Sequence, residues 1–322
     1  METIHMSHFN YSKKRMRADY TVIRSLGQIH DARSSYRPVI AILRGRKFKE
    51  VSGIDRLCDK NELLKLTQVL ANEGLGQLTS IPKGLQNIAL LEAIDMDNNA
   101  ISEVPSWLDN LSFLRNISFQ NNRLFGWPAA FNKLNFLEGL YLSNNEIGTI
   151  PNAAFSHMMN LEKLSLHCCD LNEFNVQFQD YCQLNYLDLS WNDIKCIDTD
   201  LSKCARLEHL DLNNMKLTSL PKDIFGLLNL AYLSMSGTLV SHIPDEIIQL
   251  TNLRVLDLSD CGLFSIPLKL LQLPNLEELY LGGNYFSKEH KEQIIQYAPK
   301  KLKLDYGSMF GDFVDLDDEW WN

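Results

Sequence analysis

The chain lacks the features of membrane and secreted proteins. It has no run of about 18 apolar residues, which is the length that a membrane-spanning helix needs. Its first residues, METIHMSHFNYSKKRMR, contain no uninterrupted apolar stretch of the kind found in a signal peptide. Its seven cysteines are odd in number and scattered, whereas a disulfide framework needs clustered pairs. These absences predict a cytoplasmic protein of a reducing compartment, without a transmembrane segment or ordinary secretory export.

Sequence motifs of common enzymes are also missing. GLGQLTS at residues 74–80 lacks the lysine of a phosphate-binding loop, and neither HExxH nor GxSxG occurs. The adjacent residues His167, Cys168 and Cys169 raise the alternative of a zinc site, but strand neighbours point to opposite faces and zinc ligands must converge. We therefore expect no enzyme activity, no cofactor and no metal. The alternative is an enzyme whose small amino-terminal piece is targeted by the rest of the chain.

Positive charge is concentrated at the amino terminus. Residues 1–56 contain 12 Lys or Arg and 5 Asp or Glu, which leaves 19 and 35 for residues 57–322. Because phosphate binding needs clustered positive charge, the acidic body argues against nucleic acid as a partner. The basic segment either contacts an anionic membrane surface or an acidic protein, or forms a solvated face paired with the acidic body. The basic residues in question are Arg37, Arg44, Arg46, Lys47 and Lys49.

A repeat occupies most of the chain. Leucines recur every 23 residues, with a single insertion between Leu137 and Leu161. The nine units begin at Leu91, Leu114, Leu137, Leu161, Leu184, Leu207, Leu230, Leu253 and Leu276. Alternation of period two within each LxLxx stretch predicts a short strand, and the proline that often follows stops its extension. One such unit cannot bury its apolar edge alone, so the units are predicted to stack into a curved solenoid.

Each unit reads LxxLxLxxN and usually continues xLxxIP, as in LEGLYLSNNEIGTIP at residues 137–151. These units resemble the leucine-rich repeat family, over about residues 78–304. The resemblance implies an α/β solenoid with a curved parallel sheet on its concave side, short helices or turns on its convex side, and terminal caps. It also implies that position 9 forms an interior ladder of small polar side chains. Position 9 is Asn99, Asn122, Asn145, Cys169, Asn192, Met215, Thr238, Cys261 and Asn284.

We expect five segments along the chain. Residues 1–55 are a basic segment whose apolar runs form strands or lie against the cap. Residues 56–77 are a helical amino-terminal cap, because DKNELLKLTQVLANEG has Asp59 and Glu62 in a capping-box arrangement. Residues 78–287 are the repeat array, residues 288–304 a carboxyl-terminal cap, and residues 305–322 an acidic, aromatic tail. The carboxyl-terminal cap helix follows Ser287 and is expected to present Ile294, Ile295 and Tyr297 to the last coil.

The concave face is the predicted binding site. In the unit L1-x2-x3-L4-x5-L6-x7-x8-N9 the leucines point inward, so positions 3 and 5 project from the exposed side and positions 7 and 8 lie on its flank. Tyr and Trp are enriched where binding energy concentrates, and carboxylates side by side on a sheet favour a positive partner between them. The predicted partner-binding residues are Tyr141, His167, Tyr186, Asp188, Trp191, His209, Asp211, Tyr232, Asp257 and Tyr280. The alternative is that these aspartates and tyrosines serve only to build and shield the sheet.

The leading prediction for function is a non-enzymatic protein–protein interaction module. Its partner is expected to be a protein with a basic and apolar patch, and the chain itself is expected to be a monomer. The repeats resemble those of intracellular scaffolds and of bacterial effectors delivered into the host cytoplasm. The acidic, aromatic end is similar in composition to the ends of type IV secreted effectors. A resident intracellular scaffold or signalling adaptor is the alternative.

Overall fold

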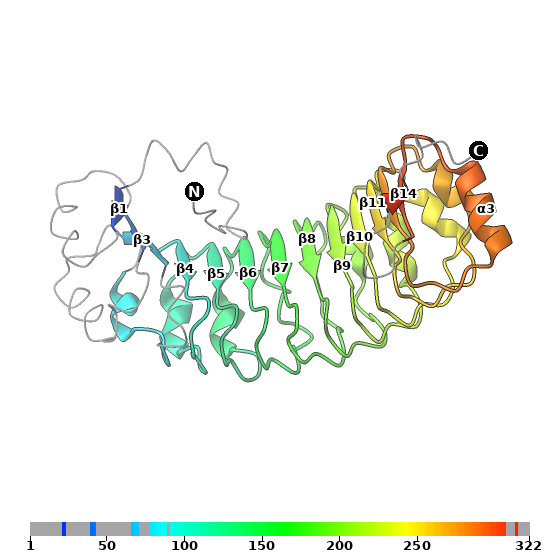
Figure 1. The fold of residues 1–322 in the computed structure, drawn as a ribbon. Coiled ribbons are helices and arrows are strands. Elements are labelled where there is room, and N and C mark those ends of the chain that lie inside the picture. Colours follow the sequence, from blue (N-terminus) through cyan, green and yellow to red (C-terminus); the bar gives the residue numbers. More distant parts are fainter. Residues whose placement is uncertain are drawn as a thin grey trace.

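A computed structural model describes residues 78–88 and 91–306 in full, together with the backbone of four short strands outside them. The described strands form a single sheet in which they follow each other in chain order (Figure 1). The strands are β1 (Thr21–Ile23), β2 (Val39–Ile42), β3 (Leu66–Leu70), β4 (Ala93–Asp95), β5 (Asn116–Ser118), β6 (Gly139–Tyr141), β7 (Lys163–Ser165), β8 (Tyr186–Asp188), β9 (His209–Asp211), β10 (Tyr232–Ser234), β11 (Val255–Asp257), β12 (Glu278–Tyr280), β13 (Lys303–Asp305) and β14 (Phe313–Val314). The predicted solenoid with a parallel sheet is confirmed, because β4 to β13 are parallel and line the inner side of the arc.

Each strand of the array covers positions 3 to 5 of its unit, and position 4 forms the centre of the core. The position-4 residues Ile94, Ile117, Leu140, Leu164, Leu187, Leu210, Leu233, Leu256 and Leu279 are all 0% exposed. Because side chains alternate along a strand, burying position 4 turns positions 3 and 5 toward the concave side. The register repeats without slippage, so equal positions of neighbouring units face each other, as Tyr186 faces His209.

Within residues 78–306, apart from 89 and 90, the convex side carries seven short 3-10 helices. They are η2 (Lys83–Asn87), η3 (Ser106–Asn110), η4 (Ala129–Lys133), η5 (Leu201–Lys203), η6 (Lys222–Gly226), η7 (Asp245–Gln249) and η8 (Leu268–Gln272). A proline is the N-cap of each except η5, where the Asp200 side chain accepts from the Ser202 N–H. Proline suits the start of a helix, where its missing N–H would have no partner in the helix. The prolines that end the strand segments therefore also start the returning turns.

The interior ladder at position 9 joins successive coils. Asn192 Nδ2 donates to the carbonyls of Leu166 and Leu189 at 2.8 and 2.7 Å, and its Oδ1 accepts from the N–H groups of Cys169 and Leu171 at 3.0 Å. Asn145 bonds in the same way two units earlier along the ladder. The ladder role implied by the family resemblance is thus confirmed at these asparagines.

Other residue types at position 9 replace only part of the hydrogen bonding that asparagine supplies. The thiol of Cys169 donates to the Leu142 carbonyl at 3.2 Å, and the Thr238 hydroxyl donates to the Met235 carbonyl at 2.8 Å. Met215 is buried in the core and its thioether cannot donate. The sixth unit therefore lacks the side-chain donor that asparagine supplies elsewhere.

The expectation of a helical cap over residues 56–77 is wrong where the structure describes this segment. Leu66–Leu70 form strand β3, which pairs in parallel with β4 through Val69 and Ile94. The physical reason is that the edge of β4 offers unpaired N–H and C=O groups, and an added strand satisfies them. Strands β1 and β2 continue the sheet in the same way. Of the two arrangements expected for the apolar runs of the basic segment, the structure therefore shows strands. Asp59 and Glu62 lie outside the described residues.

The carboxyl-terminal end closes with helix α3 (Lys288–Tyr297), seen at the end of the array in Figure 1. Its N-cap is Ser287, whose hydroxyl accepts from the His290 N–H at 3.1 Å, as expected from the sequence. Ile294 is buried, whereas Ile295 and Tyr297 are exposed, so only one of the three residues expected to cover the last coil does so. Strand β13 pairs in parallel with β12, and β14 pairs with β13 antiparallel.

Candidate concave binding face

Three aromatic rings stack across the centre of the concave face. Tyr186, His209 and Tyr232 occupy position 3 of β8, β9 and β10, which the parallel register places side by side. The ring centroids of Tyr186 and His209 are 4.5 Å apart with planes inclined by 13°, and those of His209 and Tyr232 are 4.1 Å apart with planes inclined by 5°. The predicted aromatic ladder is therefore present in the geometry of the sheet.

The stack is uncharged at neutral pH. Burial lowers the pKa of His209 to about 4, although the nearby Asp188 carboxylate acts in the opposite direction. Burial raises the pKa of both Tyr186 and Tyr232, and neighbouring aspartates add to this effect. A neutral imidazole between two neutral phenols offers a flat surface with polar edges to a partner.

The aspartates at position 5 have a structural role that the sequence analysis named only as its alternative. Asp188, Asp211 and Asp257 each accept, through Oδ1, the N–H of the residue two positions on, at 3.0 Å. This bond closes the turn that follows each strand. One carboxylate oxygen is thus used inside the chain, and the negative charge remains at the half-buried concave surface.

Among these aspartates, Asp211 has a perturbed pKa. The pKa of Asp211 is raised to about 7, mainly by burial; the hydrogen bond from the Asn213 N–H acts in the opposite direction, and the charges of Asp188 on the neighbouring strand and of Asp257 two strands away add smaller increases. Asp188 and Asp211 face each other on neighbouring strands, and like charges side by side on a sheet are unfavourable without a positive group between them. The face is therefore suited to a cationic ligand.

Trp191 occupies a backbone position that does not suit it. Position 8 is left-handed in every unit of the array, and it is filled elsewhere by asparagine, aspartate, glycine or Cys168. At Trp191 φ is 58°, a conformation that costs a bulky L-residue of order 1 kcal/mol or more. Its side chain is nevertheless 58% exposed, so little core packing offsets the cost.

A chain of contacts connects Trp191 to Asp188 through His167 and Ser190. The rings of His167 and Trp191 meet edge to face with centroids 6.3 Å apart. His167 Nδ1 lies 2.8 Å from the Ser190 hydroxyl, which itself donates to Asp188 Oδ1 at 2.5 Å. Because the hydroxyl proton of Ser190 goes to Asp188, His167 Nδ1 is the donor to Ser190.

Ser190 was missed as a site residue by the sequence analysis. It occupies position 7 of its unit, and the signal that could have found it was the assignment of positions 7 and 8 to the flank of the concave face. The same position in the next unit is Asn213, whose Oδ1 accepts from the Ser234 hydroxyl and from the Ser236 N–H. Position 7 therefore connects neighbouring strands along the flank.

Two predicted residues lie apart from this centre. Tyr141 is 3% exposed, so the prediction that it extends the exposed face is wrong. Its ring folds over Gly139, since a Cβ built there would lie 2.9 Å from Tyr141 Cε2. Tyr280 donates to the Glu278 carboxylate, which also lies 3.6 Å from Lys303 Nζ. Tyr280 thus belongs to a polar cluster beside the carboxyl-terminal cap.

His167 and Cys169, two of the residues of the zinc alternative, do not converge on one point. No group of three or more His, Cys, Asp or Glu side chains in the described part of the chain could hold a metal ion. The thiol of Cys169 points to the core and His167 bonds Ser190 on the other face, so their side chains diverge. Among the described residues, moreover, no helix has the length and apolar character needed to cross a bilayer.

A solenoid of this kind, with one parallel strand per coil and an asparagine ladder, defines a class of repeat protein. A model of the leucine-rich repeat family matches residues 128–171 and 205–263. With the fold, this match shows that the chain is a leucine-rich repeat protein. No curated protein matches the sequence.

Solved structures share this fold at low identity. The plant peptide hormone receptor RGFR1, solved in complex with RGF2, is 24% identical with a TM-score of 0.65, covering 88% of this chain and 49% of the receptor chain. The functional domain of InlJ from Listeria monocytogenes is 21% identical with a TM-score of 0.59, covering 80% of this chain and 51% of that one. The repeat domain of FLRT2, in an octameric complex with Latrophilin 3 and Unc5D, is 22% identical with a TM-score of 0.51, covering 70% and 86%. This chain spans about half the length of the RGFR1 and InlJ chains.

Proposed function

We propose that the concave face over β8 to β10 binds a protein partner that presents Lys or Arg beside an apolar group. The Tyr186, His209 and Tyr232 rings supply the apolar contact, and Asp188 and Asp211 supply the charge. The observation that carries the proposal is Trp191, which is exposed although its left-handed backbone is costly. Strain without a packing reason marks functional sites, because it persists only when something else requires the side chain.

The size of the face is compatible with a protein partner. Strands of a sheet lie about 4.8 Å apart, so the nine units present roughly 40 Å of concave surface, enough for an interface of standard size. RGFR1 and FLRT2, which share this fold, were both solved together with other proteins or peptides. This supports a binding module, and the chemistry of the partner comes from the residues of this chain.

The test is selection of displayed random peptides on the full chain. The site variant carries Asp188→Asn, Trp191→Asn and Asp211→Asn, which remove charge and the exposed ring while keeping the turn-closing amide oxygens. The matched control carries Asp223→Asn, Asp245→Asn and Phe264→Asn, changes of the same types at exposed positions outside the concave strands.

Selected peptides are expected to combine Lys or Arg with an apolar residue. They should bind wild type and control alike, and the site variant at least about tenfold more weakly, which corresponds to about 1.4 kcal/mol. Peptides without basic residues, or equal affinity for the site variant, would show that the concave assignment is wrong.

We further propose that the module is non-enzymatic and acts in the cytoplasm, either as an effector delivered into a host cell or as a resident scaffold or signalling adaptor. The six described cysteines are free thiols, which supports a reducing compartment. A reporter fused to the chain and expressed in a bacterium with type IV secretion separates the two settings. Delivery that is lost on removing residues 315–322, with an unchanged circular dichroism spectrum, supports the effector. No delivery of the full chain supports the resident protein.

A further inference from the structure

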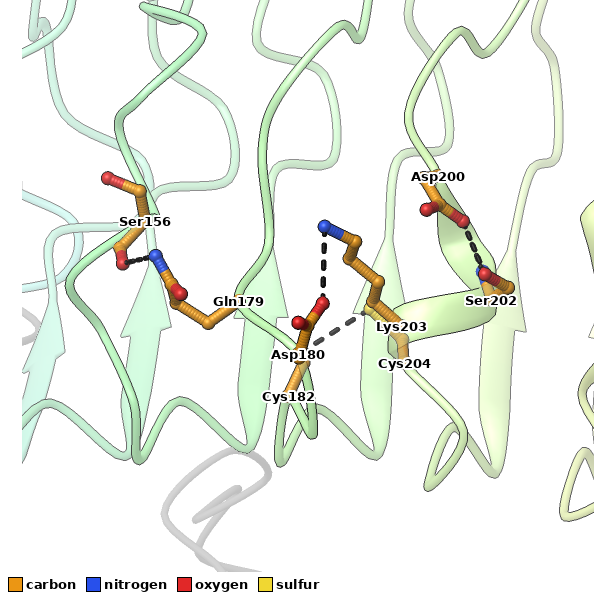
Figure 2. A network of polar contacts seen from close by, with 8 residues as sticks. All are labelled: Ser156, Gln179, Asp180, Cys182, Asp200, Ser202, Lys203 and Cys204. Atoms are coloured by element: carbon orange, nitrogen blue, oxygen red, sulfur yellow. Dashed lines mark hydrogen bonds and ion pairs between the residues drawn. The ribbon is translucent and has the colours of Figure 1, made fainter.

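Two thiols on adjacent coils lie in direct contact. The Cys204 thiol donates a hydrogen bond to the sulfur of Cys182, with the two Sγ atoms 3.5 Å apart (Figure 2). A disulfide bond is about 2.05 Å long, so the sulfurs need to approach by about 1.5 Å. Side-chain rotation on a short, irregular segment can supply a movement of this size.

The segment around Cys182 is irregular. No 3-10 helix forms between β7 and β8, a stretch that the structure describes throughout. Tyr181 there is left-handed at φ 64° and its side chain is 90% exposed. A large residue in this conformation without packing is strained. The backbone next to Cys182 is therefore less constrained than the return segments that carry a helix.

The two thiols have different environments, which suits them for consecutive steps. Cys182 is half-buried, whereas Cys204 is fully buried. Cys182 sulfur accepts hydrogen bonds from the Cys204 thiol and, at 3.5 Å, from the Leu184 N–H. The first of these lowers the pKa of Cys182, and donating it raises the pKa of Cys204. Cys182 is thus the thiol that a reagent from solution reaches first, and it loses its proton more readily than Cys204.

A flanking ion pair links the same two coils at the surface. Lys203 Nζ lies 3.4 Å from Asp180 Oδ1, directly beside the two sulfurs (Figure 2). Gln179 adds a bond to the Ser156 carbonyl of the preceding coil. The thiols therefore meet in a region where neighbouring coils are already tied together by side chains.

Three of the other four described cysteines have different contacts. Cys169 and Cys261 donate to backbone carbonyls in the interior ladder. Cys196 is exposed and its thiol lies near the Asp198 carboxylate. In the part of the chain that the structure describes, the thiol-to-thiol contact belongs to Cys182 and Cys204.

We propose that Cys182 and Cys204 are a redox site that closes to a disulfide by exchange with a low-molecular-weight disulfide such as oxidised glutathione. The Cys182 thiolate attacks one glutathione sulfur, breaks the glutathione disulfide and releases one glutathione thiolate, which takes up a proton. Cys204 then loses its proton and attacks the Cys182 sulfur of the mixed disulfide, releasing the second glutathione. Two protein thiols are oxidised, and one glutathione disulfide is reduced to two thiols.

The cross-link would join the segments that lead into β8 and β9. Cys182 lies shortly before Tyr186, the first residue of β8, and Cys204 lies shortly before His209, the first residue of β9. Oxidation would also restrict the unfolded chain by closing one repeat into a loop, which raises the stability of the folded state. The redox site stands on the thiol geometry and does not depend on the proposed partner.

The test is equilibration of the folded full chain in oxidised and reduced glutathione, followed by alkylation of free thiols, trypsin digestion and mass spectrometry. Trypsin cuts after Lys203 and Arg206, so Cys204 leaves on a short peptide that is retained only when it is cross-linked. We expect a link between this peptide and residues 164–195, which contain Cys182. Cys182→Ser should remove the link, and the matched control Cys168→Ser should keep it.

Cys204→Ala is expected to leave Cys182 as a stable mixed disulfide with glutathione, because the second step is missing. Oxidised wild type should unfold at a higher temperature than reduced wild type, and Cys182→Ser should show no such difference. The proposal is overturned if wild type carries glutathione on Cys182 while Cys204 stays free, or if the link survives in Cys182→Ser or forms only in denaturant.

Discussion

The rings of His209 and Tyr232 lie almost parallel on neighbouring strands, with their centroids 4.1 Å apart. Since the pKa of His209 is lowered by burial to about 4, the attraction at neutral pH is between uncharged rings and owes nothing to a cation. The concave face therefore holds its aromatic surface rigid before any partner binds.

A double-mutant cycle measures this contact. Combining His209→Leu with Tyr232→Leu should reveal a coupling of about 0.5–1.5 kcal/mol in the free energy of unfolding, the usual range for paired rings. The control cycle pairs Tyr232→Leu with Val255→Ala, because Val255 faces Tyr232 from the other neighbouring strand. A coupling for His209 no larger than for Val255 would show that the stacked geometry adds nothing to stability.

Trp191 is expected to lower the stability of the folded chain and to contribute to binding. Trp191→Asn places a residue that tolerates the left-handed conformation at φ 58°, so the free energy of unfolding should rise by about 1 kcal/mol in urea titration. The reverse change, Asn144→Trp at the same position two units earlier, should lower it by a similar amount. If Trp191→Asn destabilises the chain, Trp191 is retained for packing, and its exposure is not a sign of function.

The buried and the exposed asparagines differ in their importance. Asn192→Ala leaves the buried carbonyl of Leu166 and the N–H of Cys169 without their side-chain partner, and should cost about 3 kcal/mol. Asn275 also donates to the preceding coil, to the Thr251 carbonyl at 2.9 Å, but at an exposed site where water can replace it. Asn275→Ala should cost less than about 1 kcal/mol. Equal losses in the two variants would mean that burial does not govern the strength of these ladders.

The repeat could be predicted from the sequence because its period, its leucines and its position-9 asparagines are local signals. The left-handed conformation at position 8 also left a signal, since Asn98, Asn121, Asn144 and Asn214 tolerate positive φ and recur there. Recognising it would have identified Trp191 as strained. The stack of three rings could also be predicted, because Tyr186, His209 and Tyr232 occupy the same position in successive units.

Other features depended on distant neighbours. The apolar spacing of LTQVL at residues 66–70 fits a helix or a strand, and the free edge of β4 decided between them. Tyr141 is hidden because residue 139 is glycine and leaves room for its ring, which the strand pattern alone could not show. The contact of Cys182 with Cys204 arises from an irregular return segment without any repeat signature.

Asp211 and His209 should give opposite contributions to the pH dependence of stability. The pKa of Asp211 is raised from 3.8 to about 7, so the folded state binds more protons than the unfolded chain, and stability is lost as pH rises from 4 to 7. The pKa of His209 is lowered from 6.5 to about 4, so its contribution to stability grows as pH rises over 4 to 6.5. The two effects offset each other in the wild type.

Single variants separate the two contributions. Relative to wild type, Asp211→Asn should become more stable as pH rises from 4 to 7, and His209→Gln should become less stable. Urea unfolding at pH 4.5, 6 and 8 measures both differences. Parallel pH profiles for wild type and both variants would mean that neither group is perturbed.

Binding of a basic peptide should strengthen with pH for the same reason. The charge of Asp211 is only half present near its pKa of about 7, so a Lys or Arg side chain must bind the ionised fraction or displace the proton. Affinity for peptides selected on the concave face is therefore expected to rise between pH 6 and 8. Calorimetry should detect a proton that the protein releases to the buffer on binding. Asp211→Asn keeps the amide oxygen that accepts from Asn213 but has no proton to release, so its affinity should be lower and flat over this range. An unchanged slope in Asp211→Asn would assign the pH dependence to another group and remove Asp211 from the binding face.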